Sequence, residues 1–457
     1  MNKKEILEID KKYIWHPFTQ QSDYEDYDPP VIVRGKNQFL YDVNGHKYYD
    51  TIASWWTSTI GHCNSKINKG IIKQLKLLDH VNFSGFTHPY AVELTREVVS
   101  LMPPGLSRVF FSDNGSTAVE AALKISFQYY KNKGIQGKTA FVKFKNAYHG
   151  DTIGAVSVGG IEGIHDVFNE LQFKSYITEA PVCYQCRYRK SSYTFDAENT
   201  GCSFECFASI EKTIQENHEK IAAVIIEPLL QAAGKMSVYP KEYLQKLRCL
   251  TEKFNVLLIF DEVATGFGRV GTFFAMERAC VTPDIITVSK GLTGGYLPLA
   301  LTVCQESLYQ SFHGMYNEGK TFLHGHSYTA NPICCAAAIA NLKEMRRLQL
   351  PQSKCSTIDY FQMKIRDFQQ YDFIGDIRYI GLVGAVDIVK SRKSRHKFDD
   401  KERTGFKIYK ESLKNNIVLR SLGDTVYWFL PFSMSIKDID IIMERTLKSI
   451  RAVISDE

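Results

Sequence analysis

An amine and a carboxylate stand at the ends of two apolar segments of the chain. Asp261 ends the run at residues 256–261, and Lys290 directly follows the run at residues 284–289. The glycine-rich turn at residues 291–295 would let a ligand approach the backbone closely. Because ligands of doubly wound sheets bind outside the carboxyl ends of the strands, the two residues indicate an active site. On position alone, however, Lys290 is more often a salt-bridge partner.

A turn rich in small and hydroxyl residues, SDNGST at residues 112–117, precedes an alanine-rich helical segment. A helix N-terminus offers unpaired N–H groups and a partial positive charge, so Gly115 and Ser116 could bind a phosphate. The alternative is an ordinary helix cap, in which Thr117 and Glu120 form a capping box.

Tyr148 follows the strand expected at residues 140–144 and could stack on a flat cofactor, although a packed tyrosine is the commoner use of such a residue. A phosphate site, a lysine, a strand-end carboxylate and a stacking ring are together what pyridoxal phosphate requires. Lys290 would form the Schiff base with the aldehyde, and Asp261 would keep the pyridine nitrogen protonated.

A second glycine pattern, GFGRVG at residues 266–271, matches the dinucleotide fingerprint G-x-G-x-x-G. It begins five positions after the apolar run that ends at Asp261, and no clean βαβ unit with a later acidic residue follows it. Nicotinamide or flavin binding is therefore not expected.

The elements that must position these residues alternate along the chain. This alternation predicts an α/β fold with a mostly parallel sheet that is covered on both faces. The expected strands lie at residues 109–112, 140–144, 222–227, 256–261 and 284–289, and the clearest helices at residues 116–130 and 240–254.

The length of 457 residues suggests about two or three domains. Residues 1–63 are expected to form an N-terminal segment with a hairpin at Asn44-Gly45, which contributes to the smaller domain and to the substrate pocket. Residues 64–338 would form the large domain, and residues 339–457 a smaller α+β domain.

Charge and hydropathy exclude other classes of protein. The net charge of +6, from 56 basic and 50 acidic residues, does not argue for nucleic acid, and acidic residues dilute the basic loop at residues 390–403. No apolar stretch approaches the roughly 20 residues of a membrane span, and the N-terminus lacks the apolar core of a signal peptide.

The eleven cysteines favour a reducing, cytoplasmic location over a secreted disulfide scaffold. Cys183 and Cys186, followed by Cys202 and Cys206, approach a zinc-binding pattern. The second pair has a different spacing, so free thiols in an insertion are favoured and no metal is expected.

The motifs DEVATGFGR (261–269) and SKGLTGG (289–295) are similar to the signature of the class III aminotransferases of fold type I. WHPFT (15–19), SWW (54–56) and YHGDT (148–152) resemble the branch of that family that acts on 8-amino-7-oxononanoate in biotin synthesis. The resemblance covers nearly the whole chain. It implies a fold type I transferase that uses pyridoxal phosphate and works as a homodimer with its active sites at the subunit interface.

The resemblance also implies roles for individual residues. Lys290 would be the catalytic Schiff-base lysine and proton carrier, and Arg420 would receive a substrate carboxylate. The cofactor-binding residues would be Gly115, Ser116, Tyr148, Asp261, Lys290 and, from the partner subunit, Ser327. The substrate-binding residues would be Trp55, Trp56, Tyr148, Asp151, Gly325, Arg420 and Tyr427.

The amino donor stays open between S-adenosylmethionine, which the paired tryptophans favour, and lysine. Phe18 stands where many relatives carry tyrosine, and it favours the lysine users. Three other functions are the alternatives: a class III enzyme for diamines or ω-amino acids, an aminomutase or racemase on the same scaffold, and a metal-stabilised interaction protein built around the cysteines.

Overall fold

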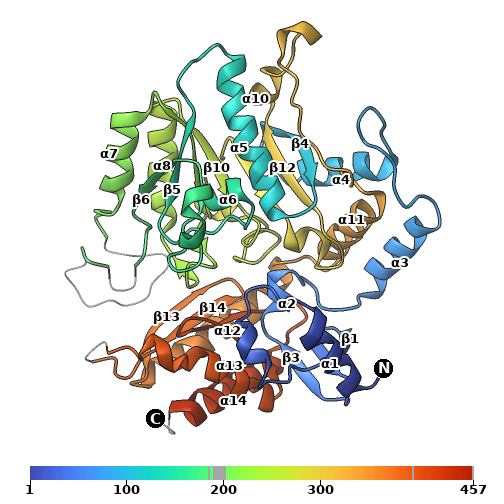
Figure 1. Cartoon of the computed structure of the whole chain (residues 1–457), viewed down its shortest axis with the longest axis vertical. Helices are drawn as coiled ribbons and strands as arrows, with labels where there is room; N and C mark the ends of the chain where they lie inside the picture. The colour runs from blue at the N-terminus through green and yellow to red at the C-terminus, as the bar shows by residue number, and fades with distance from the viewer. Residues whose placement is uncertain (184–185, 189–201, 394–395, 455–457) are drawn as a thin grey trace.

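A seven-stranded sheet forms the centre of the larger part of the chain in the computed structural model, which describes residues 1–183, 186–188, 202–393 and 396–454 (Figure 1). Its strands, in spatial order, are β4 (Leu106–Ser112), β12 (Ala300–Gln305), β11 (Ile285–Val288), β10 (Leu257–Asp261), β7 (Ile221–Ile226), β5 (Ala140–Phe144) and β6 (Tyr176–Thr178). β12 is antiparallel to both neighbours, and the other pairs are parallel. The sheet is therefore mostly parallel, as predicted.

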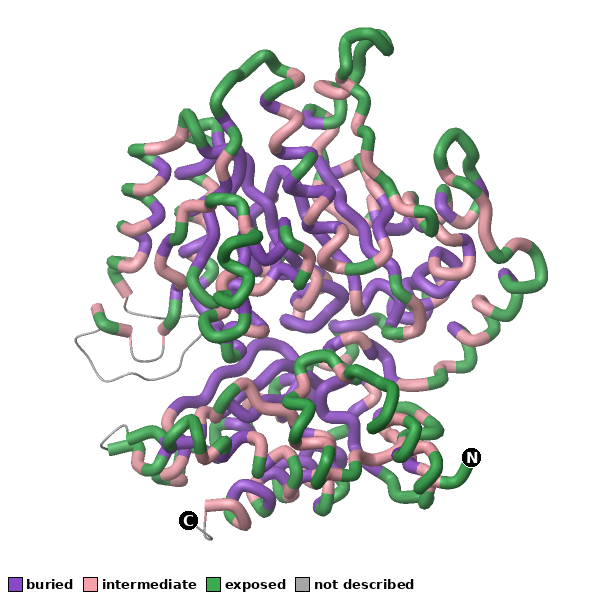
Figure 2. Tube along the Cα trace, in the orientation of Figure 1, coloured by how far each residue is buried: buried purple, intermediate pink, exposed green. Residues whose placement is uncertain are grey.

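Helices cover both faces of this sheet, and Figure 2 shows its strands as the buried centre of the upper part of the molecule. Successive residues of β10 point to opposite faces, so Ile259 packs in one apolar cluster and Leu258 in another. The first cluster includes Leu123 of α5 (Gly115–Asn132), and the second includes Leu247 of α8 (Lys241–Lys253). Burying each such side chain contributes about 1.5–3 kcal/mol, which explains why the strands are continuous apolar runs.

Further helices, from 5 to 16 residues long, lie around the large sheet. They are α3 (Ser65–Leu75), α4 (Pro89–Val99), α6 (Ile153–Val158), α7 (Phe207–Asn217), α9 (Ala275–Ala279), α10 (Glu306–Gln310) and α11 (Pro332–Arg347), with the small hairpin of β8 (Leu230–Gln231) and β9 (Ser237–Val238). The predicted domain boundary after residue 338 falls within α11, and the domain division itself stays a prediction.

The N- and C-terminal segments of the chain build a smaller part together (Figure 1). Tyr49 of the N-terminal hairpin pairs in parallel with Ile417, more than three hundred residues later. One sheet contains β1 (Ile32–Lys36), β2 (Phe39–Asp42), β3 (Lys47–Asp50) and β15 (Ile417–Val418), and the other contains β13 (Ile374–Ile380), β14 (Val383–Ile388), β17 (Thr425–Phe429) and β16 (Arg420–Leu422). The helices of this part are α1 (Lys3–Tyr13), α2 (Ala53–Trp56), α12 (Cys355–Arg366), α13 (Thr404–Lys414) and α14 (Ile436–Ile454).

Cys186, Cys206 and the seven cysteines outside the insertion are free thiols, and no group of three or more potential ligands that could hold a metal occurs among the described residues. Residues 184–185 and 189–201 of the insertion lie outside those residues. Within the described ranges, every helix is too short or too polar to cross a membrane.

Candidate active site

A cavity of about 660 Å³ lies where the carboxyl ends of the large sheet's strands face the smaller part of the chain. Nine of the twelve residues predicted for the site line it: Trp55, Trp56, Gly115, Ser116, Tyr148, Asp261, Lys290, Arg420 and Tyr427. Asp151, Gly325 and Ser327 are not among its lining residues. Both the volume and the mixed apolar and charged lining are typical of a small-molecule site.

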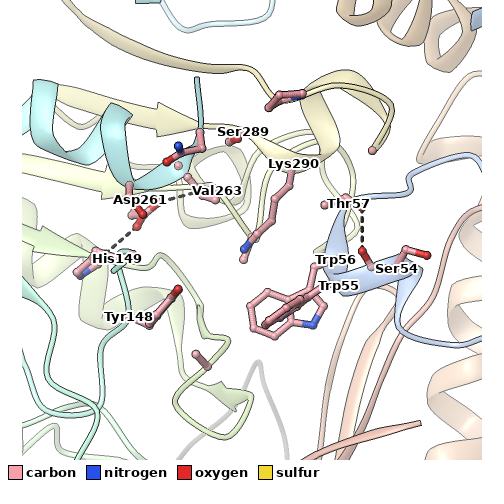
Figure 3. A pocket seen from close by; sticks show the side chains of 18 of the residues that line it. Ser54, Trp55, Trp56, Thr57, Tyr148, His149, Asp261, Val263, Ser289 and Lys290 are labelled. Carbon is pink, nitrogen blue, oxygen red and sulfur yellow. Dashed lines mark hydrogen bonds and ion pairs between the residues drawn. The ribbon is translucent and has the colours of Figure 1, made fainter. Parts of the chain in front are cut away.

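Lys290 extends into this cavity from the end of β11, between two walls that Figure 3 shows on either side of it. Its backbone has a φ of +44°, a left-handed conformation that is uncommon for a residue other than glycine and that recurs at functional sites. Burial lowers the pKa of its amine to about 8, although the nearby Asp261 and Glu227 oppose this shift. The amine therefore loses its proton far more readily than an exposed lysine does, which suits a nucleophile and a base.

Asp261 is held at the end of β10 by three hydrogen-bond partners. Its Oδ2 lies 2.7 Å from Nδ1 of His149, and its Oδ1 accepts bonds from the Thr287 hydroxyl at 3.0 Å and the Val263 N–H at 3.1 Å. The carboxylate therefore has a fixed orientation at the cavity wall. Sequence reasoning missed His149, although it directly follows Tyr148 in the YHGDT motif.

Gly115 and Ser116 begin helix α5 at the cavity wall. The capping residue is Asn114, which forms a capping box with Thr117. The predicted box between Thr117 and Glu120 is wrong, because Glu120 instead accepts bonds from the N–H groups of Gly154 and Ala155 in α6. The carboxylate of Glu120 thus fixes the start of α6 against α5.

Gly150 comes so close to the start of α5 that no side chain would fit. Its φ is +124°, and a Cβ atom there would lie 1.9 Å from Oγ of Ser116. The backbone N–H of Asp151 donates to the same oxygen at 3.3 Å. The helix N-terminus and this loop therefore form a narrow cradle with N–H and O–H donors, as a bound phosphate requires.

Tyr148 stands on the wall that also carries Asp261 (Figure 3). Its hydroxyl donates to Asp151 at 2.8 Å, and its ring stacks on His165 with centroids 5.9 Å apart. Asp151, which does not itself line the cavity, thus orients the side chain of Tyr148. The Tyr148 N–H donates to Glu227 at 3.3 Å.

Glu227 is a second residue that sequence reasoning did not assign. It lines the cavity and is buried. Burial and the negative charge of Asp261 raise its pKa well above the usual range. The carboxyl group of Glu227 therefore keeps its proton more readily than an exposed carboxyl group does.

The opposite wall carries the two tryptophans (Figure 3). Trp56 is buried, its ring lies 4.5 Å from Nζ of Lys290, and it stacks on Phe429 with centroids 5.6 Å apart. Trp55 is 40% exposed, with the Arg420 guanidinium 5.2 Å from its ring and Phe18 in edge contact. The wall therefore combines an apolar surface near Lys290 with a cation farther out.

Ser327 lies in a turn on the surface of the chain, where its carbonyl accepts a hydrogen bond from His80 at 2.8 Å. The aromatic side chain of Tyr328 is 65% exposed, and that of Leu323 is 89% exposed. The structure of one chain thus leaves the segment around Gly325 and Ser327 outside the cavity.

The described residues fit pyridoxal phosphate. The cavity holds a buried amine, a fixed carboxylate on one side of it and a cradle of donors at a helix N-terminus. These groups match the aldehyde, the pyridine nitrogen and the phosphate of that cofactor.

Comparison with known proteins places the chain in a family. Residues 22–450 match the family described as aminotransferase class-III. Adenosylmethionine-8-amino-7-oxononanoate aminotransferases from Geobacter sulfurreducens and Aquifex aeolicus are 39% and 38% identical, over 98% of this chain in both cases and 98% and 97% of theirs.

Solved structures agree with this assignment. The enzyme of the same name from Methanocaldococcus jannaschii has a TM-score of 0.92 at 32% identity, and an (S)-enantioselective omega-transaminase from Thermomicrobium roseum has 0.93 at 28%, each over 99% of both chains. The predicted fold type I architecture and the prediction of an enzyme that uses pyridoxal phosphate are thereby confirmed. The chain belongs to the class III aminotransferases.

Proposed function

We propose that this aminotransferase converts 8-amino-7-oxononanoate to 7,8-diaminononanoate in biotin synthesis, with S-adenosylmethionine as the amino donor. The names of relatives that match nearly the whole chain support this acceptor and donor. The observation that carries the proposal is the amine of Lys290, which lies in the cavity between the wall of Asp261 and the wall of the two tryptophans.

Five residues would hold the cofactor within one chain. Nζ of Lys290 would bind its aldehyde, Asp261 would face the pyridine nitrogen, and Tyr148 would stack on the ring. Gly115 and Ser116 would bind the phosphate. Pyridoxal phosphate supplies an electron sink for the removal of a proton from the carbon next to the transferred nitrogen. Lys290, released by the donor, would carry that proton, and its lowered pKa supports this role.

The substrate would lie between Tyr148 and the tryptophan wall. Trp55, Trp56 and Tyr427 offer apolar and aromatic surface for an alkyl chain, and Arg420 offers a planar cation for a carboxylate. Asp151 would act through the hydroxyl of Tyr148, which donates a hydrogen bond to it.

The working enzyme would be a homodimer in which Ser327 of the partner subunit completes the phosphate site and Gly325 of the partner subunit completes the substrate site. The position of this turn outside the cavity of its own chain, beside exposed apolar side chains, supports the proposal. A cytoplasmic location is supported by the odd number of cysteines, eleven, in a chain of this length, which is unlike a secreted disulfide scaffold.

A single-turnover assay tests the proposed donor. Enzyme loaded with pyridoxal phosphate is mixed with S-adenosylmethionine or with lysine, and the absorbance band of the cofactor bound at Lys290 is followed. S-Adenosylmethionine should remove the band faster. A faster reaction with lysine would assign the donor to lysine, the alternative that Phe18 favours.

A panel of amino acceptors tests the proposed acceptor. 8-Amino-7-oxononanoate should react far faster than the ketones and aldehydes related to diamines and ω-amino acids. The alternative, an ω-transaminase, is favoured by the similar fold of the Thermomicrobium roseum enzyme. A preference for those other acceptors would replace the proposed acceptor with that alternative.

A further inference from the structure

The glycine-rich segment at residues 266–271 places an arginine in the interior of the protein. Arg269 is 1% exposed, and it donates hydrogen bonds to the carbonyl oxygens of Leu430 at 3.1 Å, Trp56 at 3.3 Å and Ser58 at 2.6 Å. Among the described residues, no carboxylate forms an ion pair with it, and its Nε has no hydrogen-bond partner. Burying an unpaired guanidinium is costly, so its contacts need a functional explanation.

Two of the three carbonyls belong to the end of an unusual turn. All four residues of α2 have positive φ values, which are +47° at Ala53, +45° at Ser54, +67° at Trp55 and +70° at Trp56. L-residues disfavour this left-handed conformation, and a run of four of them must be held by its surroundings.

Side chains hold the turn at both of its ends. Asp50 accepts bonds from the N–H and the hydroxyl of Ser54 at 2.9 and 2.7 Å at the beginning. Arg269 binds the carbonyls of Trp56 and Ser58 at the end. The turn is thus fixed between an anion and a cation, and the direction of the Trp56 side chain depends on both.

The same guanidinium also holds the ring on which Trp56 packs. Its Cζ lies 4.9 Å from the ring centroid of Phe429, and Phe429 stacks on Trp56. The third carbonyl bound by Arg269 belongs to Leu430, the next residue in the chain. One side chain therefore determines both the backbone and the packing partner of the indole that lies 4.5 Å from the amine of Lys290.

The glycines around Arg269 explain why this motif can hold it there. Gly268 has a φ of +90°, and a Cβ atom there would lie 2.7 Å from the ring of Phe432. Gly271 also has a positive φ, of +92°. The pattern that matches a dinucleotide fingerprint therefore serves a tight turn that directs an arginine between the two parts of the chain.

We propose that Arg269 is a positioning residue of the active site, which fixes Trp56 against the amine of Lys290 and so shapes the site for the acceptor. The inference rests on the proposed attachment of the cofactor at Lys290. Independent support comes from charge, because burial lowers the pKa of Arg269 only to about 9 and it stays a cation at neutral pH. This cation is one of the groups that lower the pKa of Lys290.

The test compares Arg269→Met, which removes both the N–H donors of the guanidinium and its charge, with Arg269→Lys, which keeps the charge but not the planar set of donors. Arg392→Met is the matched control, because Arg392 also donates to backbone carbonyls, those of Ile374 and Tyr371. Neither of these two residues lines the cavity, whereas Trp56, which Arg269 binds, does. The measurements are the near-ultraviolet circular dichroism of the cofactor-free protein, the KM and kcat for the acceptor, and the pH midpoint of the absorbance band of the cofactor at Lys290.

In Arg269→Met we expect an altered tryptophan signal, a KM raised about tenfold or more, and a midpoint moved to higher pH. Arg269→Lys should change the tryptophan signal and raise KM severalfold while the midpoint stays in place. Arg392→Met should change none of these. If Arg269→Met does not fold, the tryptophan signal and the KM of Arg269→Lys alone decide whether the inference holds.

A wild-type tryptophan signal and KM in the folded Arg269 variants, or a mere loss of thermal stability with KM and midpoint unchanged, would overturn the inference. Absence of the lysine-bound absorbance band in the wild-type enzyme itself would instead contradict the proposed function. The two failures are therefore distinguishable.

Discussion

Nδ1 of His149 lies 2.7 Å from Oδ2 of Asp261, and both side chains are buried at the floor of the cavity. The other carboxylate oxygen is held by Thr287 and the N–H of Val263, so the group cannot turn away from the cavity. Nε2 of His149 has no partner among the described residues. His149 therefore orients Asp261, and through it any ring nitrogen that Asp261 binds.

Replacing this carboxylate should be more damaging than replacing its histidine partner. Asp261→Asn removes the negative charge, so kcat should fall by roughly 10²–10³-fold. His149→Gln leaves the charge but loosens its orientation, and kcat should fall about tenfold. Steady-state kinetics with saturating cofactor measures both. Equal losses in the two variants would contradict separate roles for charge and orientation.

Lys290→Ala should abolish turnover, with a loss of at least about 10²–10⁴-fold, because none of the other described residues that line the cavity is a lysine that could replace the proposed base. The cofactor can still bind through the phosphate cradle, which equilibrium dialysis would measure. Substantial transaminase activity in this variant would refute the assignment of Lys290.

The buried amine should also influence stability in a pH-dependent manner. The pKa of Lys290 is lowered from its usual 10.5 to about 8 by burial. The unfolded chain therefore binds a proton more tightly than the folded one, and folding is opposed most strongly below pH 8. The cofactor-free Lys290→Met variant should be more stable than wild type by up to about 3 kcal/mol at pH 7.

This difference should shrink as the pH rises from about 8 towards 10.5, where the amine is neutral in both states. Urea unfolding of the two proteins at a series of pH values measures it. A difference that is independent of pH, or a less stable Lys290→Met protein at pH 7, would show that the amine is not buried in its charged form at a cost.

The cradle at Gly150 should not tolerate a side chain. Gly150→Ala would place Cβ 1.9 Å from Oγ of Ser116 and push the loop away from the start of α5. We expect the Kd for pyridoxal phosphate to rise about tenfold or more, because donor hydrogen bonds to the phosphate are lost. Gly163→Ala is the matched control, since its φ of +78° is also positive but nothing lies within 4 Å of the new Cβ. Similar Kd values for both variants would reject the cradle.

Arg420 should affect substrate binding more than the chemical step. Arg420→Gln keeps a polar side chain beside Trp55 but removes the charge, so KM for the acceptor should rise by about 10–100-fold with a smaller change in kcat. Arg420→Lys should recover only part of this loss, because a bidentate fork becomes a single ammonium group. An unchanged KM in Arg420→Gln would place the carboxylate of the acceptor elsewhere.

Local sequence signals predicted the strands that end at Asp261 and before Lys290, because uninterrupted apolar runs between polar turns have few other stable placements. The small and hydroxyl residues at 112–117 likewise predicted the helix that begins at Gly115. The residues that cap this helix were not predicted correctly. Asn114 and Thr117 form the capping box, while Glu120 contacts α6, because a long side chain can satisfy a more distant partner that the local sequence does not reveal.

The sequence by itself determined which residues could do the chemistry, since an amine, a carboxylate and a helix N-terminus are properties of residue types and short spacings. Only the tertiary structure decided how they are held. His149 reaches Asp261 across 112 positions, and Arg269 reaches Trp56 across 213. Such contacts depend on how distant elements pack, and the free energy that fixes them comes from burial of the whole core, which no window of neighbouring residues contains.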